Sequence, residues 1–296
     1  MMAREGGRRP LPPKRVGLAV KLASGEAVAL GRRLVGELAR RGAVAVVERE
    51  AAQALGCAPG PPRSELGREV DLVLVLGGDG TFLAAARGCP ARTPVCGINL
   101  GSLGFLTEHA PQGALELLER VFAGTLVVEQ RDRLEVRVGG DGAGQRYLVL
   151  NDVAINKAAL ARIVSISVEV DGEFLSRYRA DGLILATPTG STAYNLSAWG
   201  PILHPALGAL LITPICSHDL ANRPLAVPMD CTVSAWVQAG AEEVYVTLDG
   251  QVGFPLAPGV RVSVTRSGEP LSLVREPTSS FFSILHQKLK WGDREE

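Results

Sequence analysis

The sequence predicts an α/β domain with a Rossmann-like parallel sheet, followed by a mainly β, sandwich-like domain. Up to about residue 108, apolar runs alternate with amphipathic stretches, which is typical of a doubly wound parallel sheet. From about residue 126, apolar and polar residues alternate with period two between glycine-rich turns, which indicates antiparallel strands. A chain of 296 residues is long enough for about two such domains.

Strands and helices alternate in the first half. Residues 15–20 predict a strand, and apolar residues from Ala27 to Leu38 mark one face of a helix that begins after Ser24 and ends at Gly42. The further elements expected here are strands at 43–48, 71–76 and 93–101 and helices at 82–88 and 114–122.

The second half predicts strands almost throughout. They are expected at 126–130, 133–138, 147–155, 164–170, 173–178, 181–187, 231–238, 243–248, 260–265 and 271–274. The closing segment, 279–291, is an amphipathic helix with Phe282, Leu285 and Leu289 on one face, and we expect it to return to the first domain. The expected boundaries are a disordered tail at 1–13, an α/β domain at 14–124 completed by 272–296, and a β-rich domain at 125–271.

The composition excludes several classes of partner. Lys plus Arg and Asp plus Glu number 31 each, so no broad field attracts nucleic acid or an anionic membrane. The basic N-terminus is not followed by a continuous apolar segment, and no run is long enough to span a bilayer. The five cysteines form no CxxC pair and have no histidine at metal-ligand spacing, which predicts free thiols in a cytoplasmic protein.

The most informative motif is Gly77-Gly78-Asp79-Gly80, at the carboxyl end of the strand expected at 71–76. Ligands of open α/β sheets bind at this edge, and the N–H groups of a helix start favour anions. A carboxylate in such a turn would repel phosphate unless it serves a metal or a reacting hydroxyl, so Asp79 suggests phosphate chemistry. The turn has neither the GxxxxGK[ST] nor the GxGxxG spacing. A plain strand-to-helix turn with Asp79 as helix cap remains the alternative.

A second motif lies in the β-rich half, at 181–197. A buried strand there ends in a turn that contains Thr187, Thr189, Ser191 and Thr192, and Tyr194 adds a ring that could stack on a base. This density of hydroxyl groups favours a ligand site over the alternative, a hydroxyl-rich helix cap.

Asn151 and Asp152 interrupt another apolar strand. An amide beside a carboxylate suits a vicinal diol such as a ribose, because buried polar groups need partners. A β-bulge or strand end is an equally good interpretation of this segment alone.

Together these motifs resemble the NAD kinase family. GGDGT, LNDVAI, DGLILATPTGSTAYNLSA, SHDLANRPL and LDGQ follow in that order, and the likeness extends from Val16 to Trp291. The TPTGSTAY block is specific, whereas GGDG is shared with diacylglycerol, sphingosine and phosphofructokinase families. The resemblance implies transfer of the γ-phosphoryl group of ATP to the 2′-hydroxyl of the adenosine ribose of NAD, with a divalent cation such as Mg²⁺. It also implies a homodimer or homotetramer.

The resemblance also implies roles for individual residues. Asp79 would be the catalytic carboxylate and Gly80 a cofactor contact, while Asn151 and Asp152 would hold the nicotinamide-side ribose and amide. The remaining implied dinucleotide contacts are Arg162, Arg179, Asp181, Thr192, Ala193, Tyr194, Asn195, Leu196, Ser197 and Gln251. No residue is implied as a dedicated metal ligand.

The chain departs from the family pattern at three positions. Asp152 stands where many members carry Glu, Trp199 replaces the first Gly of the usual SAGGP, and Ser217 stands where Pro is common. Two rival functions remain: a lipid or sugar kinase that shares the GGDG turn, and a dinucleotide sensor without turnover.

The sequence gives less information about the function of the other charged residues and of the histidines. Without the resemblance, Arg162 and Arg179 would be solvated strand-edge charges. His109, His204 and His218 have neither triad nor metal spacing, so we expect packing or capping roles for them.

Overall fold

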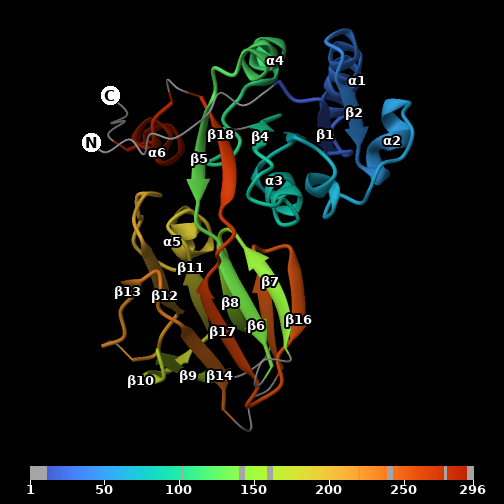
Figure 1. Cartoon of the computed structure of the whole chain (residues 1–296). Helices are drawn as coiled ribbons and strands as arrows, with labels where there is room; N and C mark the ends of the chain where they lie inside the picture. The colour runs from blue at the N-terminus through green and yellow to red at the C-terminus, as the bar shows by residue number, and fades with distance from the viewer. Residues whose placement is uncertain are drawn as a thin grey trace. The chain divides into compact units, whose positions relative to one another are not determined.

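A computed structural model of the chain describes residues 12–101, 103–139, 144–158, 163–219, 221–238, 243–276 and 279–291. The chain forms two compact units, one of residues 1–130 with 271–296 and the other of residues 131–270 (Figure 1). Most of the tail expected at 1–13 lies outside the described residues. No helix among the described segments combines the length and hydropathy that a membrane crossing requires.

The first unit contains a six-stranded sheet in the order β2-β1-β3-β4-β18-β5. Its strands are β1 Arg15–Val20, β2 Val44–Val47, β3 Leu72–Leu76, β4 Val95–Ile98, β18 Leu271–Arg275 and β5 Val127–Arg131. The pairs β1–β2, β1–β3, β3–β4 and β4–β18 are parallel, which confirms the predicted parallel sheet. β3 and β4 are buried along their whole length, as their uninterrupted apolar sequences require.

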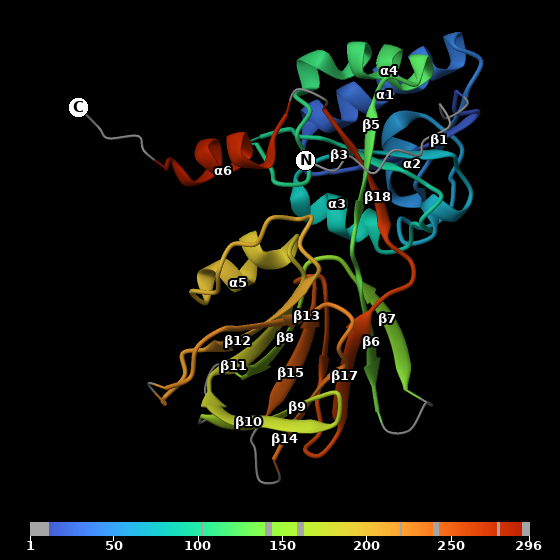
Figure 2. The same ribbon diagram turned by 60° about the vertical axis from the view of Figure 1, so that its left-hand side comes forward.

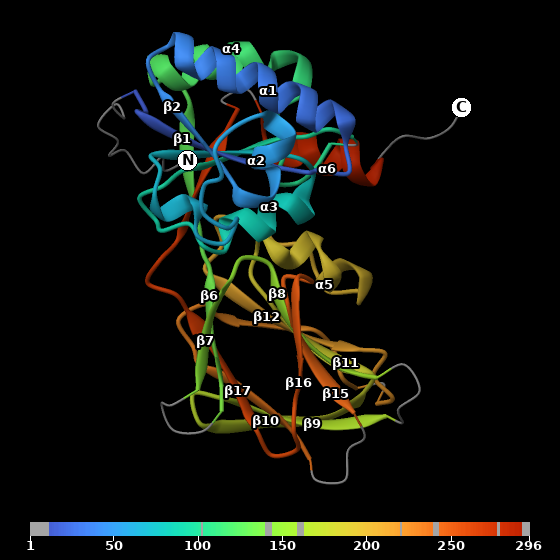
Figure 3. The same cartoon turned by 90° about the vertical axis from the view of Figure 1, so that its right-hand side faces the viewer.

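Helices cover both faces of this sheet. They are α1 Gly25–Arg40, α2 Arg49–Leu55, α3 Asp79–Ala86 and α4 Ala114–Ala123. The unit also contains helix α6 Phe281–Leu289 and short 3₁₀ turns at Leu66–Arg68 and Pro111–Gly113. α1 begins at Ser24, whose Oγ accepts the N–H of Ala27 at 3.2 Å. α1, α2 and α4 share a core with alternate residues of β1 and β3, whereas α3 lies on the opposite face (Figures 2 and 3).

One strand expected in the β-rich domain belongs to the sheet of the first unit. Residues 126–130 were expected in the β-rich domain, but β5 lies beside β18, and β18 belongs to the segment that was expected to complete the first domain from residue 272. Period-two alternation indicates a strand with one buried face, but it does not indicate with which strand that strand pairs. The pairing here joins segments about 140 residues apart, and only the folded chain reveals it.

The second unit is a sandwich of two six-stranded sheets, which confirms the predicted mainly β architecture. One sheet has the order β10-β9-β14-β17-β6-β7, and the other β13-β12-β11-β8-β15-β16. Residues of both sheets, among them Val136, Ile155 and Leu185, form one buried core. The strands are β6 Leu134–Val138, β7 Gln145–Val149, β8 Asp152–Lys157, β9 Val164–Val170, β10 Glu173–Ala180, β11 Gly182–Ala186, β12 Ala209–Ile215, β13 Leu225–Pro228, β14 Val233–Val237, β15 Val244–Leu248, β16 Val252–Pro255 and β17 Arg261–Arg266.

The single strand expected at 147–155 is in fact two. The chain leaves one sheet at the end of β7 and enters the other at the start of β8, so Leu150 and Asn151 lie at the crossing. Asn151 therefore stands at a strand end, which was one of the two interpretations of this segment.

A short helical segment packs on the outer face of the second sheet. It comprises a 3₁₀ turn at Gly190–Thr192 and helix α5 Tyr194–Ser197. Ala198 and Leu203, which follow it, pack against Ala154, Ile184 and Leu211 of the sheet.

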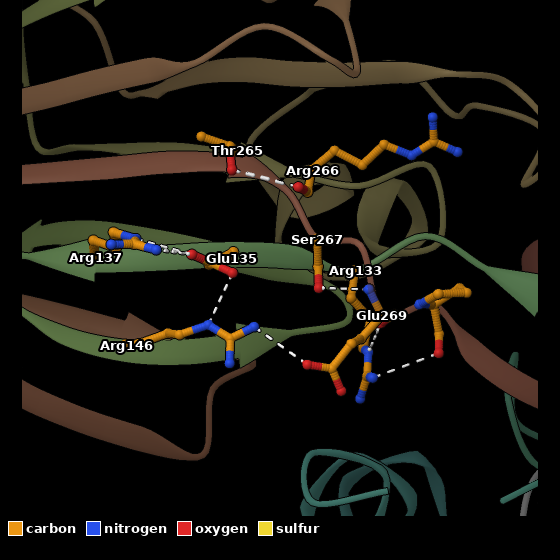
Figure 4. A network of polar contacts seen from close by, with 9 residues as sticks. Arg133, Glu135, Arg137, Arg146, Thr265, Arg266, Ser267 and Glu269 are labelled. Carbon is orange, nitrogen blue, oxygen red and sulfur yellow. Dashed lines mark hydrogen bonds and ion pairs between the residues drawn. The ribbon is translucent and has the colours of Figure 1, made fainter. Parts of the chain in front are cut away.

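Ion pairs link strands β6 and β7 on the first sheet of the sandwich (Figure 4). Glu135 accepts hydrogen bonds from Arg137 at 2.9 Å and from Arg146 at 2.8 Å, and Arg146 also reaches Glu269 at 3.3 Å. Arg133 is buried, and its Nε donates to the carbonyl of Glu269 at 2.6 Å. This contact ties the start of β6 to the segment that follows β17.

Candidate active site

The GGDG turn joins β3 to α3 at the carboxyl edge of the parallel sheet. β1 lies between β2 and β3, so the winding of the chain changes direction between β1 and β3, and ligands of such sheets bind at that point. A Cβ on Gly77 would lie 2.6 Å from Thr81 Oγ1, so only glycine fits where strand and helix meet. Gly78 is the N-cap of α3, and Gly80 is exposed in its first turn.

The carboxylate of Asp79 is held by a neighbouring loop. Oδ2 accepts the N–H of Phe105 at 2.8 Å. Oδ1 accepts the N–H groups of Leu106 and Thr107, each at 3.2 Å, and the Thr107 hydroxyl at 2.9 Å. Asp79 does not cap α3 with its own side chain, because Gly78 is the N-cap and its helix start has no side-chain cap. The carboxylate is therefore fixed in direction, and Oδ2 carries fewer of the described hydrogen bonds than Oδ1.

Gly104 lets the loop approach this carboxylate. A Cβ at Gly104 would lie 2.1 Å from Asp79 Oδ1 and 2.3 Å from Thr107 Oγ1. The N–H of Gly104 donates to the carbonyl of Thr107 at 3.2 Å, which closes the loop on itself. None of the predicted motifs includes this loop, although Gly104 was a signal in the sequence for a close backbone approach.

In the second unit, three predicted segments meet at one edge of a sheet. β8 runs antiparallel to both β11 and β15, so the start of β8 lies beside the ends of the other two. Asp152 pairs with Ala186, the last residue of β11, and Val153 pairs with Leu248, the last residue of β15. The Asn151–Asp152 pair, the TPTGSTAY turn and the LDGQ turn are thus brought together.

Asp249 organises this edge, a role that the sequence did not reveal. Its backbone has a φ of 51° in the turn after β15, in the left-handed region where Asp is tolerated better than most residues. Its carboxylate accepts N–H groups from Leu150 at 3.1 Å, Asn151 at 2.7 Å and Asp152 at 3.3 Å. The LDGQ motif had drawn attention to Gln251, which is exposed.

Asp152 is an unusual carboxyl group. It is 4% exposed, and burial raises its pKa from 3.8 to about 7, with a further contribution from the charge of Asp249 and an opposing one from the backbone N–H of Tyr194. Beside it, Asn151 Oδ1 is buried and has no hydrogen-bond partner among the described residues. A buried acceptor without a partner is costly, which suggests that a ligand donates to it.

Several hydroxyl and amide groups of the TPTGSTAY turn serve the turn itself. Thr187 Oγ1 donates to the carbonyl of Leu150 at 2.6 Å and accepts the N–H of Gly190 at 3.0 Å. Asn195, which was expected to contact a ligand, donates to Ser191 at 3.0 Å and to Pro201 at 3.1 Å and accepts the Thr213 hydroxyl at 2.7 Å. The capping interpretation therefore accounts for part of the motif.

The rest of this segment offers surface to a ligand. Tyr194 is 41% exposed, and its hydroxyl reaches Asn156 Oδ1 at 3.4 Å. Thr192, Ala193 and Leu196 are partly buried, and Ser197 is exposed. Thr192 Oγ1 donates to the carbonyl of Thr189 at 3.3 Å.

The other predicted contacts lie at the opposite end of β8 and β11. Asp181 pairs with Lys157 at 3.2 Å, which gives Lys157 a structural partner. Arg179 is exposed at the end of β10, and its carbonyl accepts the N–H of His218 at 2.9 Å. Arg162 lies outside the described residues.

Trp199 occupies a position that favours glycine. It ends the helical segment with a φ of 62°, and its side chain is 92% exposed. An indole ring at this backbone conformation costs about 1 kcal/mol relative to glycine.

Two parts of the chain match the domains of a known family. Residues 62–126 match the ATP-NAD kinase N-terminal domain, and residues 150–276 match the ATP-NAD kinase C-terminal domain. The NAD kinase of Geotalea daltonii is 44% identical over 283 residues, which cover 95% of this chain and 100% of the relative. That of Syntrophotalea carbinolica is 45% identical over 286 residues, with coverage of 95% and 100%. This chain belongs to the NAD kinase family.

Solved structures agree with this membership. The NAD kinase of Archaeoglobus fulgidus, in complex with ATP, superposes with a TM-score of 0.75 at 26% identity and covers 93% of this chain and 98% of its own. The yeast NADH kinase complexed with NADH superposes with a TM-score of 0.88 and covers 96% of this chain and 90% of its own. Because the two sequences are 24% identical, this likeness supports the fold alone.

The family implies a divalent cation, and the described residues allow a test of how it would be held. They contain no group of three or more His, Cys, Asp or Glu side chains that could hold a metal ion. Mg²⁺ commonly keeps several waters and binds through substrate phosphates and few protein groups. The donor set therefore fits a magnesium ion that arrives with a nucleotide better than a resident ion in a protein cage.

Proposed function

We propose that this chain transfers the γ-phosphoryl group of ATP to the 2′-hydroxyl of the adenosine ribose of NAD and so produces NADP. One observation carries the proposal: the likeness to proteins named NAD kinase extends over 95% of the chain at 44–45% identity. The anchored Asp79 and the polar edge around Asn151 and Asp152 support it chemically.

In this proposal, Asp79 acts on the attacking hydroxyl. Phosphoryl transfer has a loose transition state, so the protein mainly aligns the acceptor oxygen and neutralises charge. The backbone N–H groups of residues 105–107 hold the carboxylate in one direction, which suits the orientation of a sugar hydroxyl. Asp79 accepts the proton late, as the bond from the hydroxyl oxygen to phosphorus forms.

The β-rich domain, residues 125–271, holds NAD in this proposal. Asn151 Oδ1 accepts a hydrogen bond from the nicotinamide-side amide or ribose, which satisfies the buried acceptor. The exposed ring of Tyr194 stacks on the adenine base. The other proposed contacts are Gly80, Asp152, Arg162, Arg179, Asp181, Thr192, Ala193, Leu196, Ser197 and Gln251.

Magnesium bound to the phosphates of ATP supplies charge neutralisation when present. We further propose a homodimer or homotetramer. Exposed apolar side chains on edge strands, such as Phe174 on β10 at 60% exposure, support an interface. The five free cysteines support the reducing environment of the cytoplasm. Sedimentation velocity measures the oligomeric state.

A direct assay tests the activity. Purified protein is incubated with NAD, ATP and MgCl₂, and NADP is measured with a dehydrogenase that accepts only NADP. NADP that accumulates only when all three components are present supports the proposal. A lipid or sugar kinase would phosphorylate its own acceptor in a substrate panel but leave NAD unchanged, and a sensor would bind NAD without any product.

Asp79→Asn tests the proposed catalytic group. The substitution keeps the size of the side chain but removes its charge, so kcat should fall by about 10²- to 10⁴-fold while the Kd for NAD changes little. Glu65→Gln, which neutralises an exposed carboxylate of the same unit, is the matched control and should keep normal turnover. Near-normal turnover of Asp79→Asn would refute the role.

A further inference from the structure

Asp249 lies in a tight turn whose residue types fix its backbone. The turn joins β15 to β16, and the N–H of Gln251 donates to the carbonyl of Leu248 at 2.9 Å. The two central residues, Asp249 and Gly250, have φ angles of 51° and 61°. Positive φ at both positions is what a type I′ turn requires, and Asp-Gly is among the pairs that this turn prefers. The turn therefore sets the direction of the buried Asp249 side chain.

The Asp249 carboxylate binds a short stretch of backbone that crosses between the two sheets of the sandwich. This crossing segment comprises residues 150–152. Oδ1 accepts the N–H of Asn151 at 2.7 Å, that of Leu150 at 3.1 Å and that of Asp152 at 3.3 Å. The backbone N–H of Asp249 donates in return to the carbonyl of Asp152 at 2.9 Å. Three successive buried N–H groups thus share one carboxylate, and buried N–H groups without a partner are strongly unfavourable.

The TPTGSTAY turn holds the other side of the crossing segment. The N–H of Thr187 donates to the carbonyl of Asn151 at 2.9 Å, and Thr187 Oγ1 donates to that of Leu150 at 2.6 Å. A Cβ on Gly190 would lie 2.0 Å from the Asn151 carbonyl oxygen, so this turn packs directly against the segment. Asp249 binds the N–H groups and Thr187 binds the carbonyl groups, which restrains the backbone from both sides.

The charge of Asp249 also acts on the side chain of Asp152. Burial raises the pKa of this carboxyl group to about 7, the negative charge of Asp249 raises it further, and the backbone N–H of Tyr194 opposes both. The Tyr194 phenol is the titratable group that faces Asp152 from α5, and the neighbour of Asp152 on β11 is the uncharged Ala186. Below about pH 7, Asp152 is therefore an uncharged acid with one O–H donor and an acceptor oxygen.

We propose that Asp249 is a positioning residue for the dinucleotide: its carboxylate holds the crossing segment so that Asn151 and Asp152 present their side chains to NAD in one arrangement. This inference rests on the proposed function, in which Asn151 and Asp152 contact NAD. Asp249 acts through these two residues and not by touching the ligand. Contacts that are already ordered in the free protein bind more tightly, because less freedom is lost on binding.

The binding of NAD should then depend on pH in a defined direction. A bound dinucleotide excludes water from Asp152 and adds phosphate charge, and both effects disfavour the ionised carboxylate. NAD therefore binds better to protein in which Asp152 carries its proton, and affinity falls as the pH rises through about 7. Binding to the protonated form alone corresponds to a Kd that rises by about tenfold between pH 6 and pH 8.

Calorimetric titration with NAD tests the role of Asp249. The experiment uses the full chain without ATP or magnesium, at constant ionic strength, from pH 5.5 to pH 8.5. Asp249→Asn keeps the size of the side chain and tolerates the same left-handed backbone, but it removes the charge and one acceptor oxygen. We expect the Kd for NAD to rise by about tenfold at pH 6, and its further rise with pH to begin at a lower pH than in the unsubstituted protein. Unchanged affinity across this range would overturn the role.

Asp171→Asn is the matched control. Asp171 precedes Gly172 in a turn between β9 and β10, has a φ of 52° and accepts the N–H of Thr232 at 2.7 Å. The backbone conformation and the kind of hydrogen bond are those of Asp249, but β9 and β10 belong to the sheet that does not contain β8. This variant should keep the Kd for NAD and its dependence on pH. An equal loss of affinity in both variants would mean a general effect of weakened turns and would overturn the specific role.

Two further variants separate position from charge, and they also serve where Asp249→Asn does not fold. Asp249→Glu keeps the charge but moves the carboxylate by one methylene, so it should weaken NAD binding at every pH without changing the pH at which the Kd begins to rise. An unchanged Kd would overturn the positioning role. Asp152→Asn has no proton to lose, so its Kd should not vary with pH, and a remaining variation would overturn the link to Asp152.

The NADP assay separates this inference from the proposed function. NAD binding with the expected dependence on pH, but without NADP formation, would refute phosphoryl transfer alone. NADP formation together with equal NAD affinity in Asp249→Asn and the unsubstituted protein would refute the positioning role alone. Absence of NAD binding by the unsubstituted protein would refute both.

Discussion

Replacing Asp152 by Asn should stabilise the protein in a pH-dependent manner. The carboxyl group has a pKa of about 7 in the folded chain, raised mainly by burial and also by Asp249 from its ordinary value of 3.8. Between these two pKa values the folded state keeps a proton that the unfolded state releases, so rising pH favours unfolding across that window. Each unit of difference between the folded and unfolded pKa corresponds to about 1.4 kcal/mol of unfolding free energy. At pH 8, above both pKa values, the buried carboxyl group therefore lowers the free energy of unfolding by about 4 kcal/mol.

The assay is urea unfolding followed by circular dichroism from pH 4 to pH 8. The free energy of unfolding of Asp152→Asn should equal that of the unsubstituted protein near pH 4 and exceed it by up to about 4 kcal/mol at pH 8. Asn can still accept the N–H of Tyr194, so the local hydrogen bond survives the change.

A matched control separates this effect from a general loss of negative charge. Asp181→Asn removes a carboxylate of the same sheet whose side chain is 38% exposed and pairs with Lys157. We expect no comparable gain at pH 8 from this variant. A difference between Asp152→Asn and the unsubstituted protein that stays constant from pH 4 to pH 8 would refute the reasoning.

Three further substitutions test close contacts. Gly104→Ala would put a Cβ 2.1 Å from Asp79 Oδ1 and should lower kcat by about 10²-fold with little change in the Kd for NAD, measured by steady-state kinetics and calorimetry. Gly190→Ala would put a Cβ 2.0 Å from the carbonyl oxygen of Asn151, so it should destabilise the second unit by about 1–3 kcal/mol in urea and weaken NAD binding. Glu48→Ala removes a fully buried carboxylate that pairs with Arg63. It should lower the free energy of unfolding by about 3 kcal/mol in urea.

The sequence predicted the parts of the fold that depend on local pattern. Uninterrupted apolar residues at β3 reflect burial on both faces, and Ser24 with the apolar face after it reflects the start of α1. The placement of β5 beside β18 could not be predicted in this way, because pairing between distant segments leaves no local mark in the sequence.

The same distinction applies to the candidate site, where local motifs revealed some residues and contacts between distant segments concealed others. Asp79 was identified because its turn is compact in sequence, and the structure adds the loop that holds it. Asp249 was missed, because its partners precede it by nearly 100 residues. Asn195 has a residue type that suits a ligand contact, but its neighbours in space engage its amide.

The order of the strands also bears on how the chain is made. The second unit, residues 131–270, is continuous, so a ribosome delivers all of it before the last 26 residues emerge. The sheet of the first unit lacks β18 until then, and β5 at its edge pairs with that strand. During synthesis, the β sandwich can therefore fold first. Until β18 is synthesised, β5 has no partner strand, and the unpaired edge of β4 can pair with a wrong strand.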